Sequence, residues 1–128
     1  EQALRKLTDF VLLDRKAHGL PAGCLQVATC RSKQTLGKRT RESAHKFNDQ
    51  TLMGLEQWID RAKSNGQFAV EIPTRTAALY VDAQIATAME LQQQGVTQKE
   101  LERVFKLALT VFFEKRRPIL DEIFSEFV

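Results

Sequence analysis

The chain has 128 residues, of which 43% are hydrophobic and 27% are charged, and its formal net charge is +3. This is the length of one compact domain, large enough to bury a core without a metal or disulfide staple. Six Gly and three Pro exclude collagen-like and low-complexity sequence, and no apolar run approaches the ~18 residues of a membrane span. We therefore expect a single folded domain over residues 1–128.

The ends and the cysteines of the chain bear on its cellular context. The sequence has no signal peptide and begins with Glu1 rather than Met, so we expect a fragment or a processed product. Cys24 and Cys30 are six residues apart, a rise of about 9 Å on one helix, which is too far for a disulfide. We expect reduced thiols in a cytoplasmic protein. No pattern of His and Cys predicts a metal site.

The charge is unevenly distributed along the chain. Residues 1–66 carry 12 Lys and Arg against 7 Asp and Glu, whereas residues 67–128 carry 7 against 9. The densest basic run lies between Arg31 and Arg41. It could contact phosphate, but no aromatic side chains alternate with its cations, as a single-strand binder would need. We expect a solvated segment whose cations lie near the C-terminal end of a helix.

Apolar residues recur at three- and four-residue steps, which predicts an all-α helical bundle of five main helices and a short C-terminal helix. The first helix runs from Leu4 to about His18, where Gly19 supplies the left-handed residue that ends many helices. A second, buried helix is expected at residues 24–28. The third is long, is capped by Thr40 or Ser43, and ends at Asn65-Gly66.

The apolar spacing in the second half of the chain predicts the remaining three helices. The fourth is capped by Thr74, is rich in alanine, and runs to about Gln94 before Gly95. The fifth begins with a capping box formed by Thr97 and Glu100 and extends to Pro118. The last is a short helix over residues 119–127 with proline at its first position.

The fifth predicted helix is apolar around more of its circumference than one core requires. A surface helix needs an apolar arc of only about 100°, and the small residues of the fourth helix permit another helix to approach closely. We expect both helices to pair with their copies in a homodimer, as a four-helix interface; alternatively, one of them is central in a monomer. The predicted interface residues are Ala83, Ala86, Val104, Leu107, Ala108, Val111 and Phe112.

The run Leu20-Pro-Ala-Gly-Cys-Leu-Gln-Val-Ala28 follows a helix and a proline-containing turn. A long helix with a central Trp58 and an Asn-Gly end comes next, then an alanine-rich helix with Tyr80 near its start, and then an apolar helix opened by Thr-x-x-Glu. Over residues 1 to about 116, this order resembles the C-terminal domains of the tetracycline-repressor family of transcriptional regulators. The resemblance implies an all-α body that binds a small effector and dimerises through its last two long helices.

The same resemblance implies an N-terminal helix-turn-helix head, which we expect to be absent from this chain because no such segment precedes Leu4. The tail from Pro118 to Val128 extends past the usual end of the family. In the family the effector lies in a cavity between the first four helices, and an apolar pocket with few polar groups suits a hydrophobic or aromatic molecule. Each matching residue, taken alone, is also an ordinary core residue. The matching positions are Phe10, Leu13, Cys24, Val27, Phe47, Leu55, Trp58, Tyr80 and Gln84.

No spacing typical of a nucleophilic triad, a phosphate-binding loop or a metal site occurs, so neither catalysis nor a cofactor is predicted. The predicted function is the ligand-sensing and dimerisation domain of a transcriptional repressor, which controls DNA binding by the absent head and needs no membrane. One alternative is a free-standing helical module for protein interaction. Another is a redox sensor that uses Cys24 or Cys30.

Overall fold

A computed structural model describes residues 2–13, 17, 19, 32, 34–112 and 125. Within these residues the chain is helical and contains no strand, which confirms the predicted all-α character. The predicted helix at 24–28 and, apart from Ser125, the one at 119–127 lie outside the described residues. The elements are α1 (Gln2–Val11), α3 (Lys38–Ser64), α4 (Thr74–Gln93), α5 (Gln98–Leu109) and the 3₁₀ turn η1 (Thr110–Phe112).

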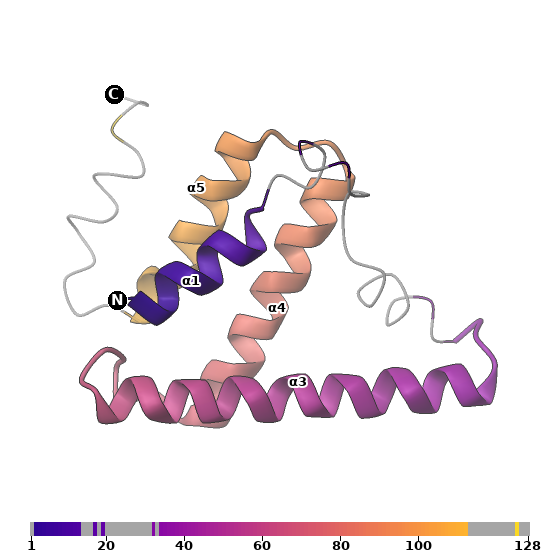
Figure 1. The fold of residues 1–128 in the computed structure, drawn as a ribbon, viewed down its shortest axis with the longest axis horizontal. Helices are drawn as coiled ribbons and strands as arrows, with labels where there is room; N and C mark the ends of the chain where they lie inside the picture. Colours follow the sequence, from indigo (N-terminus) through magenta and orange to yellow (C-terminus); the bar gives the residue numbers. More distant parts are fainter. Residues whose placement is uncertain are drawn as a thin grey trace.

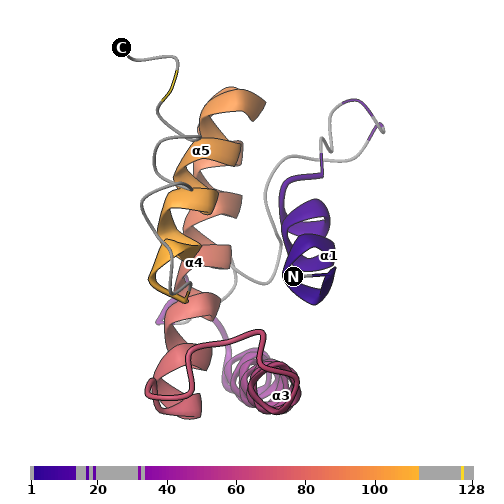
Figure 2. The same ribbon diagram turned by 90° about the vertical axis from the view of Figure 1, so that its left-hand side faces the viewer.

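The described helices form an antiparallel pair, a helix that flanks the pair, and a long helix that crosses it. α4 and α5 run antiparallel as a pair, α1 lies along one side of that pair, and α3 crosses the first turns of α4 (Figures 1 and 2). The first half of α3 extends well beyond this crossing (Figure 1). None of the described helices has the length and apolar character needed to cross a membrane.

One core joins the four helices. Ile59 of α3, Val81 of α4 and Phe105 of α5 are the largest fully buried side chains. Ala77 and Ala78 are also fully buried, and because they are small they allow neighbouring helices to approach α4 closely. The core therefore centres on α4, which the other helices contact.

Two glutamine side chains explain why α1 is shorter than predicted. The helix ends at Val11 rather than near His18, and the last carbonyls of a helix need other donors. The amide of Gln98 donates to the carbonyl of Leu12, and the amide of Gln92 donates to that of Leu13 at 3.0 Å. These donors come from distant parts of the chain, so the local sequence could not indicate them.

The start of α3 also differs from the prediction. The helix begins at Lys38 after Gly37, so Thr40 and Ser43 lie inside it and cap nothing. Lys38 and its basic neighbours therefore occupy the N-terminal end of a helix, not the C-terminal end that we expected. Cations there interact unfavourably with the helix dipole. The predicted end is confirmed, since Asn65 is the C-cap residue and Gly66 has a φ of +68°.

Polar bonds fasten α3 to the start of α4. The Lys63 ammonium donates to the carbonyl of Ile72 and, at 3.2 Å, to the hydroxyl of Thr74. That hydroxyl donates to Asp60 Oδ1 at 2.6 Å. The predicted capping role of Thr74 is therefore wrong: Pro73 occupies the N-cap position, and the Thr74 side chain links two helices instead.

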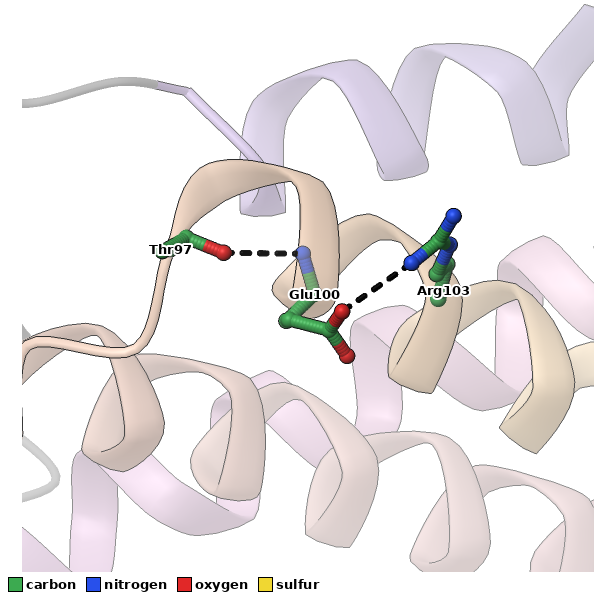
Figure 3. A network of polar contacts seen from close by, with 3 residues as sticks. All are labelled: Thr97, Glu100 and Arg103. Atoms are coloured by element: carbon green, nitrogen blue, oxygen red, sulfur yellow. Dashed lines mark hydrogen bonds and ion pairs between the residues drawn. The ribbon is translucent and has the colours of Figure 1, made fainter. Parts of the chain in front are cut away.

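The predicted cap of α5 is confirmed in part (Figure 3). The Thr97 hydroxyl accepts a hydrogen bond from the Glu100 backbone N–H at 3.3 Å. The Glu100 carboxylate, however, pairs with Arg103 at 3.0 Å. α5 ends at Leu109, well before Pro118, and the backbone tightens into η1.

Gly54 offers a direct test of helix energetics in α3. It is exposed, and a Cβ atom there would meet no heavy atom within 4 Å. Because glycine costs a helix interior about 0.5–1 kcal/mol relative to alanine, Gly54→Ala should raise the free energy of unfolding by that amount in urea titrations followed by circular dichroism. Gly66→Ala is the matched control, and it should lower stability by about 1 kcal/mol because of its positive φ. A lower free energy of unfolding for Gly54→Ala would contradict the finding that the space beside Gly54 is open.

Candidate functional site

The side of α4 that faces away from the core is the first part of the candidate site. Tyr80 of α4 bonds to Ala108 of α5, Gln92 bonds to Leu13 just after α1, and Arg75 reaches Glu56 of α3. Leu79 and Ala83 follow Arg75 at steps of four residues, so the three share one side of α4, and all three are exposed. Leu79 retains 48% of its accessible surface, although leucine is among the residues most often fully buried.

α5 also leaves apolar side chains exposed. Leu101, Phe105 and Leu109 are buried against the core. Val104 and Leu107 lie on another side of the helix and are 39% and 40% exposed. Figure 2 shows α1 on one side of the α4–α5 pair and no described helix on the other. We call the exposed set Leu79, Ala83, Val104 and Leu107 the outer face.

The predicted interface residues divide into three groups. Ala83, Val104 and Leu107 belong to the outer face, whereas Ala86, Ala108 and Val111 are half-buried. Phe112 is buried, with its ring centroid 4.3 Å from that of Phe68. Phe112 follows Phe105 by seven residues, about two helical turns, so it continues the buried side. Its assignment to the interface is therefore corrected: it belongs to the core of this chain.

The predicted effector residues are spread over several places. Phe10 and Phe47 are exposed, on α1 and on the projecting half of α3. Leu55 and Trp58 are half-buried against the core, and Leu13 and Gln84 are also half-buried. Cys24 and Val27 lie outside the described residues. The structure therefore places Leu55 and Trp58 against the same core but does not enclose Phe10 or Phe47.

Tyr80 has a defined structural role. Its hydroxyl donates to the carbonyl of Ala108 at 2.6 Å, and its ring meets that of Phe112 edge-on at 5.6 Å between centroids. The hydroxyl expected as a polar group for an effector is therefore bonded within the fold. It joins α4 to α5 and helps to set the geometry of the outer face.

Asp82 is a residue that the sequence analysis did not select. It is half-buried on α4, and burial raises the pKa of its carboxyl group above the ordinary value of 3.8. Within the described part of the chain it has no hydrogen bond or ion pair. The one feature of the sequence that could have pointed to Asp82 is its position one helical turn from Ala78 and from Ala86.

The described residues contain no group of three or more His, Cys, Asp or Glu side chains that could hold a metal ion. No protein-family model matches the chain, and neither curated proteins nor solved structures gave a match. The candidate site therefore rests on the geometry of the outer face.

Replacing Asp82 with Asn tests the cost of its burial. Because the folded-state pKa is raised, the ionised carboxylate destabilises the folded chain, and this cost is complete above that pKa and absent below about pH 3.8. Asp82→Asn should therefore be more stable than the parent at pH 7, and the advantage should shrink towards pH 3 in urea titrations. Asp49→Asn, at an exposed carboxylate of α3, controls for the lost charge. A lower stability of Asp82→Asn at pH 7 would contradict this account.

Proposed function

We propose that the chain is the effector-binding and dimerisation domain of a transcriptional repressor of the tetracycline-repressor type. The observation that carries the proposal is the outer face: two adjacent helices leave Leu79, Val104 and Leu107 exposed in one chain. In the sequence resemblance, these two helices are the ones that dimerise. The exposed strip and the resemblance thus lead independently to the same pair of helices.

A two-fold axis would place the outer face against its own copy. In such an interface the same residues contribute from both chains, so each apolar side chain counts twice. Full burial of one leucine contributes about 1.5–3 kcal/mol. The small Ala83 allows the facing helix to approach within the ~8–10 Å typical of packed helices. Together these features favour a four-helix interface formed by α4 and α5 of each chain.

The proposed effector is a small hydrophobic or aromatic molecule that contacts the half-buried Leu55 and Trp58 of α3. It acts by binding one of two arrangements of the body more tightly, because equal affinity would shift no population. The arrangement that the effector favours sets the separation of two N-terminal heads. That separation determines how the heads fit successive major grooves of DNA. We place this activity in the cytoplasm, where DNA is accessible.

A helical protein-interaction module is the second candidate function. The exposure of Phe10 and Phe47 favours it, because an enclosed effector site would be expected to bury these rings. The upstream coding sequence separates the two functions. A helix-turn-helix segment in frame supports the repressor, and a start codon near Glu1 supports the module.

Leu107→Glu tests the proposed interface. Two buried and unpaired carboxylates at the two-fold interface should weaken the dimer by at least tenfold, since an uncompensated buried charge costs several kcal/mol. Size-exclusion chromatography with light scattering measures the change. Val70→Glu is the control, because Val70 is 70% exposed in the connection between α3 and α4. An unchanged molar mass for Leu107→Glu would place the interface elsewhere.

A further inference from the structure

The end of α3 carries a chemically reactive pair, Asn65 followed by Gly66. Asparagine is thermolabile because the backbone nitrogen of the next residue can attack its side-chain amide carbon. Glycine hinders that attack least, since it has no Cβ and a freely adjustable backbone. Asn65 is exposed, so its side chain is accessible to water. Asn48, the other asparagine of the chain, is half-buried inside α3 and precedes Asp49.

A Schellman motif closes this end of the helix, where the chain turns into the connection to α4 (Figure 1). The Gly66 backbone N–H donates to the carbonyl of Lys63 at 3.0 Å. The N–H of Gln67 donates to that of Ala62 at 2.8 Å. Asn65 keeps a ψ of 5°, near the helical range. The Gly66 nitrogen is thus engaged with the helix, and it reaches the Asn65 side chain when the motif opens.

The end of α4 has the same backbone geometry and a less reactive side chain. The N–H of Gly95 donates to the carbonyl of Gln92, and that of Val96 to the carbonyl of Leu91, both at 3.1 Å. The residue before the glycine is Gln94, with a ψ of −4°. Because its side chain is one methylene longer than that of asparagine, the ring that attack would close is larger and forms more slowly. The molecule therefore contains its own control for the α3 end.

We propose that Asn65 is a site of spontaneous deamidation in the folded protein, and that opening of the α3 end controls its rate. The Gly66 nitrogen bonds to Cγ of Asn65, its proton leaves with the side-chain nitrogen as ammonia, and a succinimide forms. Water then breaks either of the two carbonyl–nitrogen bonds of the succinimide, which yields aspartate or isoaspartate. The reaction consumes water and releases ammonia. It involves neither the outer face nor an effector.

The product alters the helix end where it forms. Aspartate places a negative charge near the negative end of the α3 dipole, and Arg61, four residues earlier, offsets part of it. Isoaspartate instead adds a methylene to the backbone inside the motif, which displaces the two N–H donors from their carbonyls. Phe68 comes directly after the motif and packs on Phe112 in the core. The isoaspartate form therefore loosens the connection between α3 and α4.

Bonds beyond the motif restrain its opening. The Lys63 ammonium donates to the carbonyl of Ile72 and to the hydroxyl of Thr74, so the last turn of α3 is tied to the start of α4. Local opening at a helix end costs less free energy than global unfolding. A bond that restrains this end should therefore slow deamidation, although it does not touch the reacting atoms.

Peptide mapping by mass spectrometry, on the full chain incubated in neutral buffer, tests the site. We expect the peptide that contains Asn65 to lose its amide and to appear as both aspartate and isoaspartate, whereas Asn48 and Gln94 stay intact. In urea the motif is open, and the Asn65 rate should be roughly tenfold higher or more. An Asn65 that stays intact in the folded chain while it reacts in urea overturns the proposed site. Equal rates in the two conditions overturn the control by opening.

Lys63→Met separates the opening of the helix end from the chemistry. It removes the restraint and keeps the reacting pair, so the rate in the folded chain should rise about threefold to tenfold, the scale of one lost hydrogen bond. The rate in urea should not change. Lys106→Met is the matched control, because Lys106 pairs with Glu102 within α5, and its rate should equal that of the parent. Equal rates for the two variants in the folded chain would overturn the proposal.

Two further variants keep the test independent of Lys63. Thr74→Val removes the hydroxyl that accepts from Lys63 and should also speed deamidation. Asn65→Gln gives the end of α3 the same residue pair as the end of α4, so it should abolish the modification while circular dichroism stays that of the parent. A deamidated product that forms equally fast in Asn65→Gln would place the reaction at another residue and overturn the proposal.

Discussion

The packing around α4 is the constraint on which the rest of the structure depends. α5, α1 and α3 all contact this helix, and its small, fully buried Ala77 and Ala78 permit close approach. The side of α4 that carries Leu79 and Ala83 remains exposed. The outer face is therefore a consequence of how the core is built: a sheltered α4 would need a fourth neighbour, and no described helix supplies it.

Hydrogen bonds between distant segments fix the geometry of that core. Gln92 and Gln98 hold the end of α1 against the α4–α5 corner, and Lys63 and Thr74 hold α3 against the start of α4. The Tyr80 hydroxyl joins α4 to α5. Each bond satisfies a polar group at a helix end or in the interior, where an unpaired group is costly. The helices that present the outer face are thus held in a defined arrangement.

Local chemistry made some elements predictable from the sequence and left others unpredictable. The Asn65-Gly66 end and the Thr97 cap follow from backbone rules that act within a few residues, and both are confirmed. The early end of α1 and the role of Thr74 depend on partners far along the chain, so both were predicted incorrectly. The exposure of Val104 and Leu107 agrees with the wide apolar arc seen in the sequence. The positions of Phe112 and Tyr80 could not be predicted from the sequence, because they depend on how η1 and α5 pack against the rest of the fold.

The central claim is that the outer face is covered by a second chain. Sedimentation velocity of the unmodified chain, over a wide range of protein concentrations, tests this claim most directly. The account predicts a reversible two-chain species of twice the 14.6 kDa protomer mass, which becomes dominant as the concentration rises. A single species of 14.6 kDa at every concentration would contradict it, because Leu79, Val104 and Leu107 would then remain in water.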